Sequence, residues 1–302
     1  MAEQPAEQPL VTVVTATYDM AGLLGETMDA VLGQDYRNIE YIVVDDGSRD
    51  NTAEVVAARA RDPRVRYVHQ ENAGQTRAKN RGIEESTGEY IAFCDADDVW
   101  LPHKLSTQIP RFLVEDPPGL VYADTVFFDE HGNDLPTPHC ERFGGRILGK
   151  LLIDNFIPFP TTVVSRKVID DLGPFDERRS MAIDYEMWLR ISTRYWIDYV
   201  PEVLARYRIW SGQMSHRRAE RLDNAFKIMI EFQEKHADAI DPIDLRKAWG
   251  YAFTTRAKFH NRNDRPRDAS ADFLRAFARW PFSRRTWWEF AAFALGPRPR
   301  VD

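Results

Sequence analysis

The chain has 302 residues, which is enough for one large α/β domain with an extension and for no more than two structural units. Hydrophobic residues make up 43% and charged residues 29%, as is ordinary for a globular protein. The formal charge of −7 argues against general nucleic-acid binding, which requires a basic surface, so we expect no nucleic-acid partner.

The sequence carries no pattern for membrane insertion or for an oxidising compartment. No run of about 18 apolar residues occurs that could cross a bilayer. Residues 1–9 are polar and contain proline, so we expect a disordered tail and not a signal peptide. Cys94 and Cys140 form no Cys-x-x-Cys pair, which predicts reduced thiols and a cytoplasmic protein, with Cys94 as a core residue.

Short β-branched runs alternate with helical stretches through the first third of the chain. The alternation predicts a doubly wound α/β sheet, in which ligands bind beyond the carboxyl ends of the strands. Near-continuous apolar runs favour strands that are buried on both faces. The expected strands are 10–15, 39–45, 65–69 and 90–94, and the expected helices are 23–32, 52–60 and 76–85.

The later part of the chain is less regular and ends in helices. We expect residues 10–215 to form one domain with two halves, 10–98 and 99–215. Residues 216–302 then form a helical C-terminal region. The expected elements are strands at 121–128, 162–165 and 203–209, a turn-rich loop at 131–138, and helices at 146–154, 184–193, 221–236, 245–260 and 269–279.

Three carboxylates follow the fourth predicted strand, in Asp95-Ala96-Asp97-Asp98. Their mutual repulsion disfavours three negative charges unless a cation lies among them. A divalent ion that bridges carboxylate and diphosphate oxygens would satisfy this site, because Mg²⁺ and Mn²⁺ prefer oxygen ligands. The alternative is a solvated acidic turn in which one aspartate caps the next helix.

Two other strand ends also carry polar groups. After the second strand, Asp45 or Asp46 could accept hydrogen bonds from a base or a ribose, although Asp and Ser are also ordinary turn and cap residues. After the third, a glycine turn leads into a helix whose first turn carries Arg77 and Lys79. Cations are unfavourable at a helix N-terminus, so these two indicate an anionic ligand, or else a solvated face.

A later helix begins with the acid Asp184 and continues with an apolar face. An N-cap is the natural role for Asp184 at this position. The aromatic residues Tyr185, Trp188 and Tyr195 fit a protein core better than a sugar platform.

Taken in order, "VVTATYD", "VVDDGSRD", "ENAGQTRAKNRG", "FCDADDVWLPHKL" and "AIDYEMWLR" resemble the family 2 glycosyltransferases with the GT-A fold. The resemblance covers residues 10–215 and implies a mixed, doubly wound α/β sheet. It implies a catalytic domain there, with a nucleotide-binding half at 10–98 and an acceptor-binding half at 99–215. It implies that Asp184 is the catalytic base, and that Asp95, Asp97 and Asp98 bind Mn²⁺ or Mg²⁺. The implied nucleotide-sugar contacts are Thr15, Ala16, Tyr18, Asp45, Asp46, Asn72, Gly74, Arg77, Asp95 and Ala96.

The implied activity is an inverting, hexosyltransferase-like transfer from a UDP-linked sugar to an acceptor hydroxyl, as in polysaccharide, lipid-linked glycan or glycoconjugate synthesis. The partners are then a nucleotide-sugar donor and a carbohydrate or lipid-linked acceptor, and a homodimer stays open. A haloacid-dehalogenase-type phosphatase, a sugar nucleotidyltransferase and a non-catalytic sugar-nucleotide-binding protein are the alternatives.

The chain departs from the family pattern at three places. Asp19 stands where members often have Asn, and Ile183 precedes Asp184 where many have Glu, which leaves Glu186 as the fallback base. Trp210 stands where members have a histidine after "Tyr-Arg". If that histidine binds metal or diphosphate in relatives, either His216 or Ser215 replaces it here or no residue does.

The C-terminal tail has a composition of its own. Aromatic residues and arginines alternate there with Glu289 as the only acid, which gives a local charge of +5. This composition is typical of a helix that lies in a membrane interface, here the cytoplasmic leaflet, and core packing with solvated arginines is the alternative. The residues are Phe273, Phe277, Trp280, Phe282, Trp287, Trp288, Phe290 and Phe293, with Arg275, Arg279, Arg284, Arg285, Arg298 and Arg300.

Overall fold

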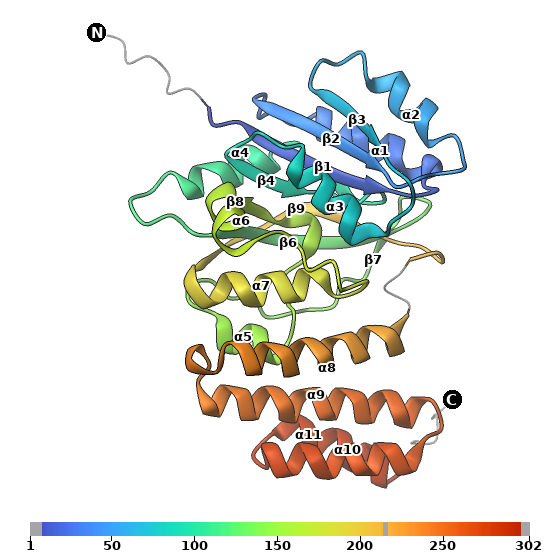
Figure 1. The fold of residues 1–302 in the computed structure, drawn as a ribbon. Helices are drawn as coiled ribbons and strands as arrows, with labels where there is room; N and C mark the ends of the chain where they lie inside the picture. The colour runs from blue at the N-terminus through green and yellow to red at the C-terminus, as the bar shows by residue number, and fades with distance from the viewer. Residues whose placement is uncertain (1–7, 214–216, 297–302) are drawn as a thin grey trace. The chain divides into compact units, whose positions relative to one another are not determined.

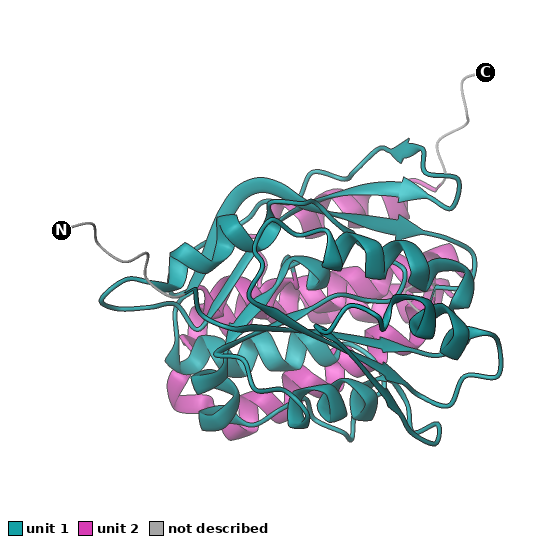
Figure 2. Cartoon of the chain, turned by 90° about the horizontal axis from the view of Figure 1, so that it is seen from above, with its two compact units in different colours: residues 1–146, 156–216 teal, residues 147–155, 217–302 magenta. Residues whose placement is uncertain are grey.

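A computed structural model describes residues 8–213 and 217–296 of the chain. The expected disordered tail at 1–9 and the residues Ser215, His216, Arg298 and Arg300 therefore lie wholly or largely outside the described residues. The chain divides into two compact units, coloured separately in Figure 2. Unit 1 comprises residues 1–146 and 156–216, and unit 2 comprises residues 147–155 and 217–302.

Unit 1 is built on a mixed sheet with the strand order β3-β2-β1-β4-β8-β6-β9-β5, and β7 pairs with β6 (Figure 1). Strands β1 to β4 are parallel, whereas β8 runs antiparallel to both β4 and β6. The predicted doubly wound mixed sheet is confirmed. The strands are β1 (Val11–Thr17), β2 (Ile39–Asp45), β3 (Val65–His69), β4 (Tyr90–Phe93), β5 (Val99–Trp100), β6 (Leu120–Asp129), β7 (Asp134–Leu135), β8 (Val163–Ser165) and β9 (Ile197–Ile209).

Helices of unit 1 connect these strands. The predicted helices of the first third are confirmed within two residues at each end. The helices are α1 (Ala21–Leu32), α2 (Thr52–Arg59), α3 (Gln75–Glu84), α4 (Lys104–Gln108), α6 (Arg166–Leu172) and α7 (Ile183–Arg194), with 3-10 turns η1 (Ile109–Phe112) and η2 (Phe159–Thr161).

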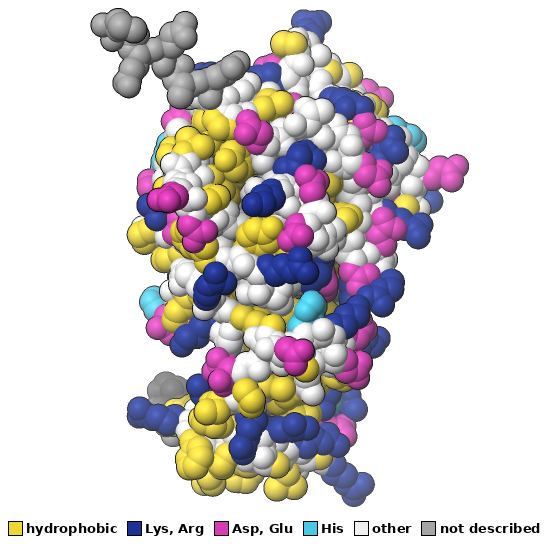
Figure 3. All heavy atoms as spheres, turned by 60° about the vertical axis from the view of Figure 1, so that its left-hand side comes forward, with side chains coloured by type: hydrophobic (Ala, Val, Ile, Leu, Met, Phe, Trp, Pro, Cys, Tyr) yellow, Lys and Arg dark blue, Asp and Glu magenta, His cyan; other side chains and the backbone are white. Residues whose placement is uncertain are grey.

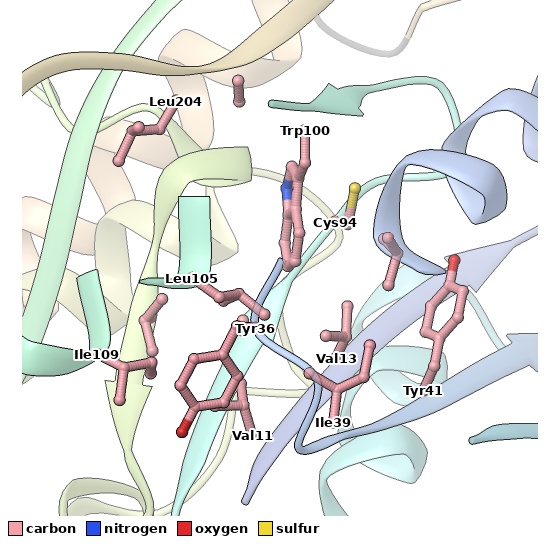
Figure 4. Close-up of a cluster of buried hydrophobic side chains, with 14 of the residues drawn as sticks. Val11, Val13, Tyr36, Ile39, Tyr41, Cys94, Trp100, Leu105, Ile109 and Leu204 are labelled. Atoms are coloured by element: carbon pink, nitrogen blue, oxygen red, sulfur yellow. The ribbon is translucent and has the colours of Figure 1, made fainter. Parts of the chain in front are cut away.

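The core of unit 1 gathers side chains from β1 and β2 with residues that follow β4. In Figure 4, Val13, Ile39 and Tyr41 lie on one side of this cluster, and Trp100 and Cys94 lie beside them. The Trp100 indole donates a hydrogen bond of 2.8 Å to the carbonyl of Pro160, which satisfies its only polar group. Cys94 is buried, and burial raises the pKa of its thiol, in keeping with the expected core role.

One expectation about burial is wrong. Strands β1, β2 and β4 are buried along nearly their whole length, but β3 is half-buried to exposed. β3 lies at the edge of the sheet and pairs only with β2, so one side has no neighbouring strand. The expected loop at 131–138 also contains β7, which forms a hairpin with β6.

Unit 2 is helical. It consists of α5 (Leu148–Ile153), α8 (Arg218–Lys235), α9 (Pro242–Arg262), α10 (Pro266–Arg279) and α11 (Arg284–Ala294), with the 3-10 turn η4 (Ala237–Ala239). α9 starts with Asp241 as N-cap, whose side chain accepts from two backbone N–H groups, and with Pro242 at its first position. Among the described residues, no helix is both long and apolar enough to cross a membrane.

Candidate active site

Asp95 follows β4, at the carboxyl end of a central strand, with its side chain 31% exposed. Its Oδ1 lies 2.8 Å from Nζ of Lys79, which α3 supplies and which is almost fully buried. The same ammonium lies 5.0 Å from the centre of the Phe159 ring. Lys79 therefore places a desolvated positive charge beside Asp95, in a position suited to a diphosphate.

Asp97 is hydrogen-bonded by a residue at the end of β9. The indole Nε1 of Trp210, the residue that follows β9, donates to Oδ2 of Asp97 over 2.8 Å. Burial, and then the negative charge of Asp95, raise the pKa of Asp97. A cation beside Asp97 would favour the ionised form that burial and Asp95 disfavour.

Asp98 differs from its two neighbours because its side chain is fully buried. Its Oδ1 accepts from the backbone N–H of Arg208 at 3.0 Å, and the Arg208 Nε donates to the carbonyl of Asp97 at 2.8 Å. Burial, followed by the charges of Asp97 and Asp95, raises the pKa of Asp98. This position favours a structural role for Asp98 over the predicted metal ligation.

Asp95 and Asp97 could bind a metal ion whose other ligands come from the substrate. Within residues 8–213 and 217–296, no group of three or more His, Cys, Asp or Glu side chains is arranged as a metal site. Asp95 and Asp97 supply carboxylate oxygens at one strand end. Mg²⁺ is commonly held by one or two carboxylates together with substrate phosphates, so two ligands suffice for such a site. Ala96 between them is buried and can offer only its backbone.

The two aspartates after β2 organise the adjoining loops. Asp46 accepts from the backbone N–H groups of Ala73 and Gly74, at 2.9 and 2.8 Å, and from the Gln70 amide at 2.7 Å. Asp45 accepts from the Ser48 N–H at 2.9 Å and from the Tyr67 hydroxyl at 2.6 Å. Both carboxylates are buried. Direct contact of either with a nucleotide stays a prediction.

Glycine is required where these two loops meet. Gly47 has φ +78°, and a Cβ built on it would lie 2.8 Å from the backbone nitrogen of Asn72. Gly74 has φ +92° and precedes α3, with no heavy atom within 4 Å of a built Cβ. The open space beside Gly74 leaves its backbone approachable, and Asn72 beside it is exposed.

The residues at the end of β1 and just after it divide between core and surface. Thr15 is buried, with its hydroxyl 3.1 Å from that of Tyr41, so its side chain belongs to the core. Ala16 is half-buried and Tyr18 is exposed. Asp19 has φ +51°, and its carboxylate accepts from the Arg49 N–H at 2.6 Å. Asp and Asn tolerate this left-handed conformation, which explains why either suits the position.

Arg77, predicted to meet an anionic ligand, is 61% exposed and lies 3.2 Å from a carboxylate oxygen of Glu177. Lys79 is two residues further along α3 and points to a different face of the helix, toward Asp95. The cation that α3 presents to the acidic strand end is therefore Lys79.

α3 also anchors the segment that leads to Asp184. The Thr76 hydroxyl donates to the carbonyl of Arg179 at 2.6 Å, and the Asn80 amide exchanges two hydrogen bonds with the backbone of Phe175, at 2.9 and 3.0 Å. Ala182 follows with φ +54°, a left-handed conformation that is costly for a residue with a Cβ. This strained turn sets the start of α7 and the half-buried position of Asp184.

The fallback base, Glu186, is engaged in a structural contact. Its carboxylate accepts from Nε and Nη2 of Arg190, at 2.8 and 3.0 Å. The Arg190 guanidinium also donates to the carbonyls of Leu172, Gly173 and Pro174. This bidentate pair ties α7 to the segment after α6 and gives Glu186 a structural contact.

Comparison with known proteins places this arrangement in a family. The family model for glycosyl transferase family 2 matches residues 12–173, which is more than half of the chain. The chain belongs to glycosyl transferase family 2. An uncharacterized glycosyltransferase of Rickettsia bellii is 29% identical over 211 residues, and the match covers 69% of this chain and 30% of that protein. The chain thus spans about a third of the length of such relatives.

Solved structures show the same fold. The mannosyltransferase PcManGT from Pyrobaculum calidifontis, in complex with GDP-Man and Mn²⁺, has a TM-score of 0.64 at 21% identity, over 97% of this chain and 82% of that one. S. aureus TarS 1-349, in complex with UDP-GlcNAc, has a TM-score of 0.64 at 16% identity, over 93% of this chain and 87% of that one. The fold of this family 2 chain is therefore GT-A.

Three contacts of this family 2 site were not predicted from the sequence. They are the pairing of Lys79 with Asp95, the support of Asp97 and Asp98 by Arg208, and the hydrogen bond from Trp210 to Asp97. The "Tyr-Arg" motif pointed to the right segment, because Arg208 and Trp210 lie at its end. Residues 215 and 216, expected to replace the missing histidine, lie outside the part of the chain that the structure describes.

Proposed function

We propose that this chain is a metal-dependent, inverting glycosyltransferase that transfers a sugar from a nucleotide diphosphate sugar to an acceptor hydroxyl. The observation that carries the proposal is the double contact of α3. Through Lys79 it contacts Asp95, and through Thr76 and Asn80 it holds the segment that precedes Asp184. One helix thus connects the candidate diphosphate site with the candidate base.

The donor site in this proposal lies at the ends of β1, β2 and β4. Asn72, Gly74 and Tyr18 are accessible there for the nucleotide, while Asp46 keeps the loop at 70–74 in place. A divalent cation, Mn²⁺ or Mg²⁺, bound by Asp95 and Asp97 would neutralise charge on the diphosphate leaving group. Lys79 adds a fixed positive charge beside Asp95.

Asp184 is the proposed general base. It would accept the proton of the acceptor hydroxyl as the oxygen attacks the anomeric carbon. Glu186 is bound to Arg190, and the proposal assigns Asp95 and Asp97 to the metal, which leaves Asp184 as the carboxylate proposed to act on the acceptor. A single base suits direct displacement, which inverts the anomeric configuration.

Substrates of the relatives guide the choice of donor. One related structure holds UDP-GlcNAc and another holds GDP-Man. We propose a UDP-linked donor, a carbohydrate or lipid-linked acceptor, and action in the cytoplasm. Because one related complex holds a UDP-linked sugar and the other a GDP-linked sugar, a screen for the donor must include both kinds.

The test is thermal unfolding of the full chain with a panel of UDP-linked and GDP-linked sugars and Mn²⁺. One donor should raise the unfolding temperature by mass action, and EDTA should abolish the shift. Asp97→Asn should also lose it, whereas Asp116→Asn, at an exposed acid, should retain it. An equal shift in a metal-free preparation would contradict the metal site. Release of pyrophosphate from nucleoside triphosphate and sugar phosphate would indicate a nucleotidyltransferase instead.

A further inference from the structure

The aromatic residues of the C-terminal tail separate into two groups. Phe273, Phe290 and Phe293 pack together, with ring centres 5.5 and 5.4 Å from that of Phe273. Phe277 contacts Phe290 at 5.5 Å, so these four form the interior of the α10–α11 hairpin. Core packing, the alternative to membrane contact, therefore accounts for these four residues. Trp287 also contacts the Phe277 ring at 4.4 Å and Trp280 is half-buried, so Phe282 and Trp288 are the aromatic residues that core packing leaves most exposed.

The other group lies on the outside of α11. Trp288 is 69% exposed, Leu295 79% and Trp287 55%, and Phe282 just before the helix is 77% exposed. Arg284, Trp288, Ala291 and Leu295 are spaced by four, three and four residues, which places them on one helical face. We call Arg284, Trp287, Trp288, Ala291 and Leu295 the α11 outer face.

Charge on this helix is distributed in a way that leaves the α11 outer face apolar and basic. The only acid of the helix, Glu289, forms an ion pair with Lys258 of α9. Of the two arginines in α11, Arg285 lies 4.0 Å from the centre of the Tyr251 ring, so Arg284 is the basic residue of the α11 outer face. Figure 3 shows apolar and basic side chains side by side on the helical region at the lower end of the view.

We propose that the α11 outer face docks on the surface of an anionic lipid bilayer. α11 has 11 residues, about half of the roughly 20 needed to span a bilayer, so it would lie in the plane of the interface. Tryptophan is favoured at that depth because its ring is apolar and its N–H is polar, and arginine is drawn to anionic headgroups.

Charge argues against a second copy of the chain as the occupant. A two-fold contact through the α11 outer face would place Arg284 of both copies in one interface, and that face has no acid to pair with them. Like charges at such a contact oppose association. An anionic bilayer instead carries charge opposite to that of Arg284. Because the rest of the chain is net negative, the bilayer would repel it, and this repulsion would turn the α11 outer face toward the membrane.

Vesicle flotation of the full chain tests this proposal without any sugar nucleotide, so its outcome is separate from that of the proposed function. The protein should float with vesicles of phosphatidylcholine and phosphatidylglycerol, and not with phosphatidylcholine alone, and high salt should release it. Trp288→Glu and Arg284→Glu should each lower the partition coefficient by at least about fivefold, the effect of one cation near such a surface.

Matched controls lie in unit 1. Leu113→Glu replaces an apolar residue that is 60% exposed, and Arg61→Glu replaces an exposed arginine. Both should float as the unaltered chain does. Failure of the unaltered chain to bind anionic vesicles would overturn the proposal, as would equal flotation of Trp288→Glu. Self-association that Trp288→Glu abolishes, without vesicle binding, would also overturn it and assign the face to a second copy.

Discussion

Trp210 donates its indole N–H to Oδ2 of Asp97 over 2.8 Å, and so joins the end of β9 to the acidic end of β4. The bond favours the ionised form of a carboxylate whose pKa is otherwise raised by burial and by Asp95. Trp210 stands where family members have a histidine, and in this chain the position supports the carboxylate through a hydrogen bond.

Trp210→Phe should keep the aromatic ring and remove this bond. A hydrogen bond to a charged group contributes about 1.5–3 kcal/mol, so metal-dependent nucleotide-sugar affinity should fall about tenfold or more. Isothermal titration calorimetry with Mn²⁺ present measures it. Trp196→Phe is the matched control, because that indole donates to a backbone carbonyl at 3.2 Å, away from the acids. Equal affinity of Trp210→Phe and the unaltered chain would remove Trp210 from the site.

Gly82 on α3 lies where the helix packs closely against β1. A Cβ built there would lie 2.3 Å from Cγ1 of Val14 on β1, so Gly82→Ala should destabilise the fold by about 1–3 kcal/mol through overpacking. Gly22→Ala on α1 has nothing within 4 Å and should gain about 0.4–1 kcal/mol. Urea unfolding of the two variants should therefore shift in opposite directions. A neutral Gly82→Ala would mean that α3 and β1 pack less closely than described.

The backbone is strained at Ala182, two residues before the proposed base Asp184, and this strain can be tested by substitution. With φ +54°, Ala182→Gly should cost little or nothing, because glycine adopts this conformation without steric penalty. Ala182→Val should destabilise more than Ala182→Gly, since a β-branched residue is least suited to positive φ. At exposed Ala53 within α2 glycine should instead cost about 1 kcal/mol, because its helix propensity is low. Equal costs for glycine at both positions would argue against a strained turn at Ala182.

The sequence predicts the parts of this fold that depend on local pattern. Apolar runs locate β1, β2 and β4, and the polar motifs that follow them locate the candidate site. The edge position of β3 and the short strands β5 and β7 depend on pairing with distant residues, and no local pattern encodes that.

Side-chain roles within the motifs were harder to predict, because they too depend on contacts with residues that are distant in the sequence. Asp95, Asp97 and Asp98 are indistinguishable in a run of acids, yet it is the carboxylate of Asp98 that accepts from the backbone N–H of Arg208, 110 residues away. Arg77 and Lys79 are two residues apart, and helix geometry alone sends them to different faces. Which of the two meets the acids depends on how α3 packs on the sheet.

The central claim is that Asp184 acts as the base in sugar transfer, and paired variants isolate it. Asp184→Asn preserves shape but cannot accept a proton, and Glu186→Gln alters the acid that is bound to Arg190. Donor affinity should change little in either variant, because the base acts on the acceptor. Affinity must be measured beside turnover, so that a loss of binding is not mistaken for a loss of catalysis.

The decisive measurement is the turnover of Asp184→Asn with the donor and acceptor that the unaltered chain uses. We expect turnover to fall by roughly 10²–10⁴-fold at unchanged donor affinity, the usual contribution of a general base. Glu186→Gln should retain most of the turnover per folded molecule, even if the loss of its contact with Arg190 lowers stability. Near-normal turnover of Asp184→Asn, together with an inactive but folded Glu186→Gln, would contradict the assignment of Asp184.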